Sequence, residues 1–275
     1  MEFLDIFIPA AILAALGAFF GIVLAVASRV FAVKVDERVP QIREALPGAN
    51  CGGCGFSGCD ALATAIAEGR APCNACPVGG DEVAAKIATV MGVSAEKKQR
   101  MRAQVMCMGN HESAAKKYVY DGVLDCVAAS RLAGGDKLCA DGCLGLGSCA
   151  SACKFNAISV QNGLAVVDPD RCGGCGACAA ACPKYLIRLV PHDAPYAVAC
   201  MSHEKGAAVT KQCKMGCIGC SLCVKSCEAG AISVQGFLAE IDPAKCVGCG
   251  ACAAKCPRHV IVCTNGRASV SATSM

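Results

Sequence analysis

Cys172-Gly-Gly-Cys175-Gly-Ala-Cys178-Ala-Ala-Ala-Cys182-Pro183 is the most informative stretch of this chain. Its spacing, C-x2-C-x2-C-x3-C-P, lets three cysteines hold one iron–sulfur cube while the fourth reaches a neighbouring cube. The same spacing returns in Cys246-Val-Gly-Cys249-Gly-Ala-Cys252-Ala-Ala-Lys-Cys256-Pro257. Because neither chance nor disulfide pairing would repeat both the spacing and the proline, the sequence predicts a protein that moves electrons.

The composition supports metal clusters rather than disulfide bonds. Of the 275 residues, 26 are cysteine, and all of them lie at or after Cys51. Neighbouring cysteines in a C-x2-C-x2-C run are poorly placed to pair with each other, so a disulfide framework does not explain them. Aromatic residues make up only 4% of the chain, so its hydrophobic cores are expected to be small. Domains with small cores are commonly stabilised by bound metal.

The formal net charge of +4 counts every thiol as neutral. A cube held by four thiolates carries about −2, so six cubes would turn the total to roughly −8. The basic balance is therefore no evidence for nucleic-acid binding. The run from Lys97 to Arg102 is expected to be a solvated helix face, with a docking patch for an acidic electron carrier as the alternative.

The N-terminus predicts a membrane anchor. Residues 6–28 contain no charged side chain over 23 positions, which is long enough for a helix to cross a bilayer. Acidic residues precede this run and Arg29 follows it, whereas a secretory signal would begin with positive charge. The positive-inside rule then places the bulk of the chain in the cytoplasm, behind a single pass through the cytoplasmic membrane.

We expect an α+β chain with five segments. They are a transmembrane anchor (1–34), a helical 4Fe-4S domain (35–100), a first ferredoxin-like unit with a leading segment (101–190), a second ferredoxin-like unit (191–265) and a polar tail (266–275). Within the helical domain, a charged helical stalk is expected over 35–49 and amphipathic helices over 60–68 and 81–91.

An internal repeat with an offset of 74 residues defines the two ferredoxin-like units. Residues 157–161 recur as residues 231–235, and in the first copy a second apolar stretch over 164–167 follows the turn signal Asn162-Gly163. This pattern predicts a short β-hairpin in each unit. The same offset also relates cysteines of the two copies, among them Cys126 to Cys200 and Cys139 to Cys213.

The crossed ferredoxin rule assigns the cysteines of the second unit. One cube is expected on Cys217, Cys220, Cys223 and Cys256, and the other on Cys227, Cys246, Cys249 and Cys252. In the helical domain, four further cysteines follow the spacing C-x2-C-x4-C-x16-C. They are Cys51, Cys54, Cys59 and Cys76.

The first unit departs from the rule because Leu146 occupies the position that corresponds to Cys220. Cys139 is the expected substitute, and a three-ligand cube or a 3Fe–4S cluster at that site is the alternative. The resulting sets are Cys139, Cys143, Cys149 and Cys182 for one cube, and Cys153, Cys172, Cys175 and Cys178 for the other.

These assignments use twenty cysteines in five 4Fe-4S clusters. As a hypothesis, four of the remaining six hold a sixth cluster between the copies: Cys107, Cys126, Cys200 and Cys213. Buried structural thiols are the alternative interpretation of these four. Cys73 could replace Cys76 as a ligand, but Cys76 carries the following proline, so Cys73 and Cys263 are left free.

No catalytic residue is assigned. The chain has no glycine-rich dinucleotide fingerprint, no P-loop and no nucleophile set with a general base. Its four histidines are scattered. The chain is therefore expected to relay electrons rather than to bind a substrate.

Taken together, the anchor, the Asn50–Cys59 motif with residues 76–80, and the ferredoxin units opened by residues 143–149 resemble the B subunit of the Rnf complex. The resemblance covers nearly the whole chain. It implies a subunit of an ion-translocating ferredoxin:NAD oxidoreductase that pumps sodium ions or protons. It also implies soluble ferredoxin as electron donor, and other membrane and flavin-bearing subunits as partners. A tethered polyferredoxin that serves a different reductase, or a non-redox zinc scaffold, are the alternatives.

The metal content of anaerobically purified protein tests this interpretation. With four irons per cube, we expect about twenty-four irons per chain for six clusters and about twenty for five, with a brown absorbance that dithionite bleaches. A colourless protein that contains zinc instead would contradict the electron-transfer interpretation.

Overall fold

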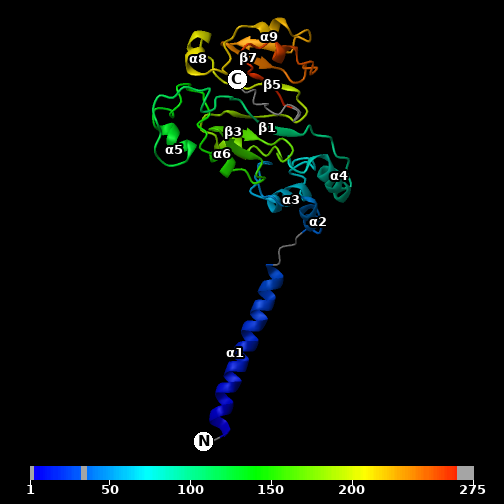
Figure 1. Cartoon of the computed structure of the whole chain (residues 1–275). Coiled ribbons are helices and arrows are strands. Elements are labelled where there is room, and N and C mark those ends of the chain that lie inside the picture. The colour runs from blue at the N-terminus through cyan, green and yellow to red at the C-terminus, as the bar shows by residue number, and fades with distance from the viewer. Residues whose placement is uncertain (1–2, 32–35, 265–275) are drawn as a thin grey trace.

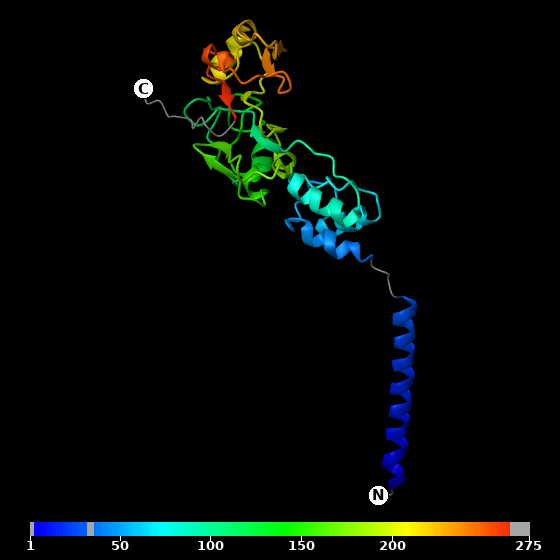
Figure 2. The same ribbon diagram turned by 90° about the vertical axis from the view of Figure 1, so that its right-hand side faces the viewer.

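The computed structural model describes residues 3–31 and 36–264, so the tail expected at 266–275 lies outside the described residues. Short helices alternate with four two-stranded sheets in the described part of the chain, and the predicted α+β class is confirmed. Three compact bodies follow one another beyond a long N-terminal helix, and the C-terminal body lies farthest from that helix (Figures 1 and 2).

Helix α1 (Phe3–Val30) stands apart from the folded bodies. Its segment Ala11–Val30 has a mean hydropathy of 2.4, and none of it is buried inside the protein. A helix of 28 residues is about 42 Å long, enough to cross the hydrocarbon core of a bilayer. By length and composition, α1 is a candidate transmembrane helix, as predicted.

The first body packs three helices, α2 (Arg38–Ala45), α3 (Cys59–Ala67) and α4 (Gly80–Met91). The two amphipathic helices predicted here are confirmed. The expected stalk is wrong in one respect, because Ile42 of α2 is 0% exposed and belongs to the same apolar core as Leu62 of α3 and Ile87 of α4. An apolar side chain in the middle of a charged stretch thus anchors α2 to the domain.

Each ferredoxin-like unit contains the predicted hairpin. In the first unit β2 (Ile158–Gln161) pairs with β3 (Leu164–Val167), and in the second β6 (Ile232–Gln235) pairs with β7 (Leu238–Ile241). Asn162 and Gly163 have φ angles of 47° and 70°, as a type I′ turn requires. The registers of the two hairpins are equivalent under the 74-residue offset.

A second sheet in each unit joins strands that are distant in sequence. Strand β1 (Met101–Val105) pairs with β4 (Ile187–Pro191), and β5 (Tyr196–Val198) pairs with β8 (Ile261–Cys263). The helix expected across the basic run is wrong: Arg102 lies in β1 and is only 3% exposed. Strand pairing with β4 overrides the local pattern of charges.

Short helices begin at, contain or directly precede cysteines. They are α5 (Cys126–Arg131), α6 (Ser148–Ser151), α7 (Ala177–Ala181), α8 (Gly206–Gln212), α9 (Leu222–Lys225) and α10 (Ala251–Ala254). The leading segment of the first unit is joined to α8 of the second, since Ala115 N–H donates to the Gln212 carbonyl at 2.8 Å and Lys214 N–H to that of Ser113 at 2.8 Å. The two units are therefore connected by backbone as well as by side chains.

Gly53 joins the helical domain to the first ferredoxin-like unit. A Cβ at this position would lie 2.7 Å from the carbonyl oxygen of Cys175 and 2.8 Å from its Cα, where real Cβ atoms do not fit. We therefore expect Gly53→Ala to destabilise the contact by about 1–3 kcal/mol through overpacking. Thermal unfolding of the anaerobic protein measures this loss. The exposed Ser57 lies in the same loop, and Ser57→Ala is the control; equal midpoints for both variants would contradict the tight contact.

Candidate metal centres

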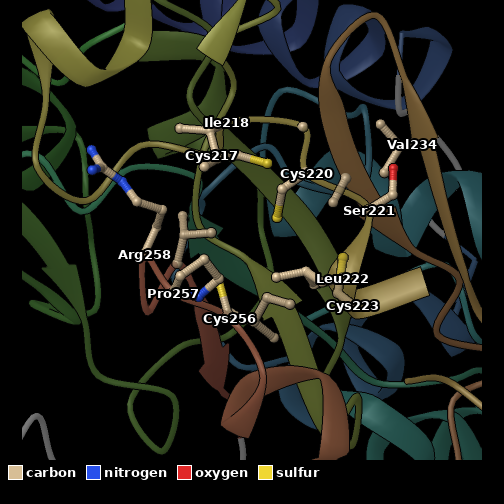
Figure 3. Close-up of a pocket in the computed structure, with 14 residues that line it drawn as sticks. Cys217, Ile218, Cys220, Ser221, Leu222, Cys223, Val234, Cys256, Pro257 and Arg258 are labelled. Carbon is tan, nitrogen blue, oxygen red and sulfur yellow. The ribbon is translucent and has the colours of Figure 1, made fainter. Parts of the chain in front are cut away.

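Two cavities of the second unit each bring together four cysteines. One is lined by Cys217, Cys220, Cys223 and Cys256, and Figure 3 shows their sulfur atoms around one shared space, with the Arg258 guanidinium directed away from it. The other is lined by Cys227, Cys246, Cys249 and Cys252. The structure thus brings together both sets that the crossed ferredoxin rule predicted.

Left-handed backbone and amide donors shape these loops. Gly219 and Ser221 have φ angles of 66° and 58°, which turn the chain sharply between Cys217 and α9. A Cβ at Gly219 would lie 2.8 Å from the Phe237 carbonyl oxygen, so glycine allows the loop to lie against the hairpin. At the other cavity Ala231 N–H donates to Cys227 Sγ at 3.3 Å; such donors favour the thiolate form that ligates iron.

The first unit departs from the predicted grouping. Its cavity is lined by Cys126, Cys143, Cys149 and Cys182, so Cys126 occupies the place predicted for Cys139. Asp125 explains this position because it caps α5 through Ala128 N–H at 2.8 Å and accepts a hydrogen bond from Ser148 Oγ at 2.7 Å. Ser148 Oγ in turn accepts from Cys126 N–H at 2.7 Å, which fixes Cys126 beside α6 and Cys149.

Leu146 explains why Cys126, and not Cys139, lines the cavity of the first unit. Cys126 is buried, and Leu146 packs against it in one small apolar cluster. In the second unit a cysteine, Cys220, stands at the position that corresponds to Leu146. Where that thiol is missing, Cys126 supplies the fourth sulfur of the cavity.

The fourth set lies between the two units. One cavity is lined by Cys107, Cys139, Cys200 and Cys213, and we call it the bridging site. A Cβ at Gly109 would lie 3.6 Å from the sulfurs of both Cys107 and Cys213, so these two sulfurs, one from each unit, lie on the same side of Gly109. The cavity differs from the predicted sixth set in one residue, since Cys139 lines it where the sequence predicted Cys126.

The bridging site is nearly symmetric. Cys107 follows β1 as Cys200 follows β5, and each sulfur accepts a hydrogen bond at 3.5 Å from a backbone N–H of its own unit, that of Cys143 or of Cys217. Cys107, not Cys126, is therefore the structural counterpart of Cys200. The segment from Cys107 to Cys139 is 19 residues longer than that from Cys200 to Cys213, and Cys126 lies in this additional length.

The four cysteines predicted as the second set of the first unit lie near one another. Burial and then the neighbouring thiols Cys172, Cys175 and Cys153 raise the pKa of Cys178 to about 11, so these four sulfurs lie close together. Ala103 N–H of β1 donates to Cys172 Sγ at 3.3 Å. Ala157 N–H does the same to Cys153 Sγ at 3.3 Å, as Ala231 does in the other unit.

In the helical domain, Cys51 and Cys54 lie near Cys76. Both thiols therefore raise the pKa of Cys76, after the larger effect of burial. Cys59 at the start of α3 is buried in the domain core against Cys54 and Cys76. Cys73 packs against the same core, but backbone N–H groups of Val78 and Gly79 donate to Cys76. These donors favour Cys76 as the ligand of this set.

The sulfur sets fit cubes better than single ions. All 26 cysteines lie within the described residues and none is disulfide-bonded. Among the described residues no group is arranged tightly enough to hold one metal ion, which requires ligand sulfurs at about 2.3 Å from zinc. Burial raises the pKa of Cys139 and of Cys149 to about 12, so both need a cationic partner to ionise at neutral pH. An iron–sulfur core bound here would supply it.

Three family models match the chain. The FeS model, which describes an Fe-S cluster domain, matches residues 46–78, the 4Fe-4S binding domain model matches residues 165–188, and the 4Fe-4S dicluster domain model matches residues 216–260. They coincide with the helical domain and with the C-x2-C-x2-C-x3-C-P run of the first unit and most of the second. The bridging site is covered by none of these three matches.

Whole-length relatives are more specific. The B subunit of an ion-translocating oxidoreductase complex from Methanosarcina acetivorans is 45% identical over 91% of this chain and 96% of that protein. The B subunit of a Na(+)-translocating ferredoxin:NAD(+) oxidoreductase complex from Acetobacterium woodii is 46% identical over 93% of this chain and 77% of that protein. The corresponding B subunit of a proton-translocating ferredoxin:NAD(+) oxidoreductase complex from Clostridium ljungdahlii is 41% identical over 94% and 91%.

Proposed function

Because the chain belongs to the B-subunit family of ion-translocating ferredoxin:NAD oxidoreductase (Rnf) complexes, we propose that it accepts electrons from soluble reduced ferredoxin and relays them to other subunits. It is an iron–sulfur electron-transfer subunit of an oxidoreductase. Its bound clusters would supply one-electron transfer. The membrane and flavin-bearing subunits of the complex would receive the electrons and carry the ion pathway.

The continuity of the sulfur sets is the observation that carries this proposal. In the second unit the two sets share one buried core. From there, Cys217 N–H contacts Cys200 Sγ of the bridging site, and Cys143 N–H contacts Cys107 Sγ on its other side. The order along the protein is thus second unit, bridging site, first unit.

The remaining sets continue towards the membrane helix. Cys149 and Cys178 share one buried core in the first unit. Cys175, beside Cys178, lies against Gly53 of the helical domain, and Cys51 of that domain raises the pKa of Cys175 after the larger effect of burial. No set is isolated from its neighbours, as a relay requires.

We assign six 4Fe-4S clusters to these sets. The ligands would be Cys51, Cys54, Cys59 and Cys76; Cys153, Cys172, Cys175 and Cys178; Cys126, Cys143, Cys149 and Cys182; Cys107, Cys139, Cys200 and Cys213; Cys217, Cys220, Cys223 and Cys256; and Cys227, Cys246, Cys249 and Cys252. Cys73 and Cys263 would remain free. The 4Fe-4S family matches support the type of cluster.

Electrons would be taken up at the second unit. Cys220 and Cys249 are the only exposed cysteines of the chain, and both belong to this unit, which lies farthest from α1 (Figure 2). Val247, beside Cys249, is 75% exposed. The exit would then be the helical domain next to α1, with the bulk of the chain on the cytoplasmic side of the membrane, where ferredoxin is available.

Replacing Val247 by glutamate tests the site of electron uptake. We expect Val247→Glu to lower the second-order rate of reduction by reduced ferredoxin about tenfold, because an added negative charge repels an acidic carrier and removes apolar contact. Stopped-flow bleaching of the cluster absorbance measures the rate. Val119 is 87% exposed in the leading segment, so Val119→Glu is the matched control. Equal rates for the two variants would place electron uptake elsewhere.

Serine substitutions test the ligand sets. We expect Cys126→Ser and Cys149→Ser to perturb the same EPR signal, since their thiols line one cavity, and Cys139→Ser and Cys213→Ser to perturb a different one. The iron content should fall by about four per chain if a cube is lost. A shared signal for Cys139→Ser and Cys149→Ser would instead restore the grouping predicted from sequence.

A further inference from the structure

Lys137 is the most deeply buried charged side chain among the described residues. It is 1% exposed and lies in the leading segment of the first unit, two residues before Cys139. Removing an ammonium group from water costs several kcal/mol unless a negative group compensates it. A negative group close to Lys137 would offset this cost.

Direct hydrogen-bond partners do not supply the negative charge. Lys137 Nζ donates to the carbonyl oxygens of Gly109 and Gly163, which carry no formal charge. Among the described residues Lys137 forms no ion pair. The adjacent carboxylate, Asp136, binds Lys116 at 3.0 Å instead. Asp141 is another carboxylate nearby, on the wall of the bridging cavity, and it too forms no ion pair with Lys137.

The contacts of Lys137 lead to the bridging site, whose thiolates would carry negative charge around a cluster. Gly109, whose carbonyl accepts from Lys137, donates its own N–H to Cys107 Sγ at 3.3 Å. A Cβ at Gly142 would lie 3.4 Å from Lys137 Cδ and 3.5 Å from Cys139 Cβ. The Lys137 charge also lowers the pKa of Cys107 against the larger opposite effect of burial. The ammonium thus lies beside the bridging site and acts on the sulfur of Cys107.

We propose that Lys137 supplies a fixed positive charge that raises the reduction potential of the bridging centre above the value its four cysteines alone would give. This inference rests on the proposed function. Reduction by one electron, delivered from a neighbouring centre, adds one negative charge to the site without forming or breaking a covalent bond. A nearby buried cation stabilises that reduced state more than the oxidised one.

The repeat provides a matched control. The position that corresponds to Lys137 under the 74-residue offset is Lys211, which lies on α8 and is exposed. Solvent screens an exposed charge. Removal of the Lys211 charge should therefore leave the reduction potential of every centre unchanged.

An anaerobic redox titration of the full-length, cluster-loaded protein, followed by EPR, tests the proposal. In Lys137→Met we expect the redox equilibrium of one centre to shift about tenfold towards the oxidised form, which corresponds to about 59 mV for one electron. That centre should be the one whose signal Cys213→Ser removes. Lys137→Arg, which keeps the charge, should shift it less, and Lys211→Met should shift none.

Three results would overturn the proposal: no shift in Lys137→Met, an equal shift of all centres, or an equal shift in Lys137→Arg and Lys137→Met. If Lys137→Met does not fold or load iron, Lys137→Gln replaces it with the same criteria. Failure of the proposed six-cluster relay is distinguishable, because Cys213→Ser would then remove no signal. A signal that is present but unmoved by Lys137→Met counts against Lys137 alone.

Discussion

Convergence of sulfur atoms is the constraint on which the rest of this structure depends. The buried apolar cores of the two ferredoxin-like units are small and combine cysteine and alanine with a few valine, isoleucine and leucine side chains. The strands have only three to five residues and form four separate pairs in the described chain. Isolated two-stranded sheets are marginal in water, so the hairpins need the cysteine loops packed against them, and metal binding then contributes directly to folding.

This constraint explains where backbone freedom is used. Left-handed residues cluster in the loops that carry cysteines, and glycines occupy the closest approaches, such as Gly53 against Cys175. Backbone N–H groups that would otherwise be unpaired point at sulfur, as Ala103 does at Cys172. The same loops that close a site therefore also set its electrostatics, since amide donors and charge are the main protein influences on cluster potential.

The spacing of the cysteines in the sequence predicted many of the sulfur sets. The two sets of the second unit and Cys51, Cys54 and Cys76 of the helical domain lie near one another as their intervals predict. The hairpins followed from Asn162-Gly163 and its apolar flanks. The hairpins and the C-x2-C steps depend on residues close together in sequence, where propensity and spacing act directly, and the ferredoxin rule adds the distant fourth ligand of each set.

Long-range pairing could not be obtained in this way. Arg102 looked solvated among its basic neighbours, yet it is buried once β1 pairs with β4, about 90 residues away. The fixed 74-residue offset equated Cys126 with Cys200, whereas the insertion after Cys107 makes Cys107 the true counterpart. One signal was available: Cys-Met occurs at both Cys107-Met108 and Cys200-Met201, each directly after the region that becomes the first strand of its unit.

The bridging site draws Cys107 and Cys139 from one unit and Cys200 and Cys213 from the other. Neither half of the repeat can build it alone, whereas the four other sulfur sets of the ferredoxin-like units each draw on a single half. A cluster held by these four sulfurs would be completed only after both halves of the repeat have folded and docked. Insertion of that cluster would join the clusters of the two ferredoxin-like units into one continuous electron-transfer chain.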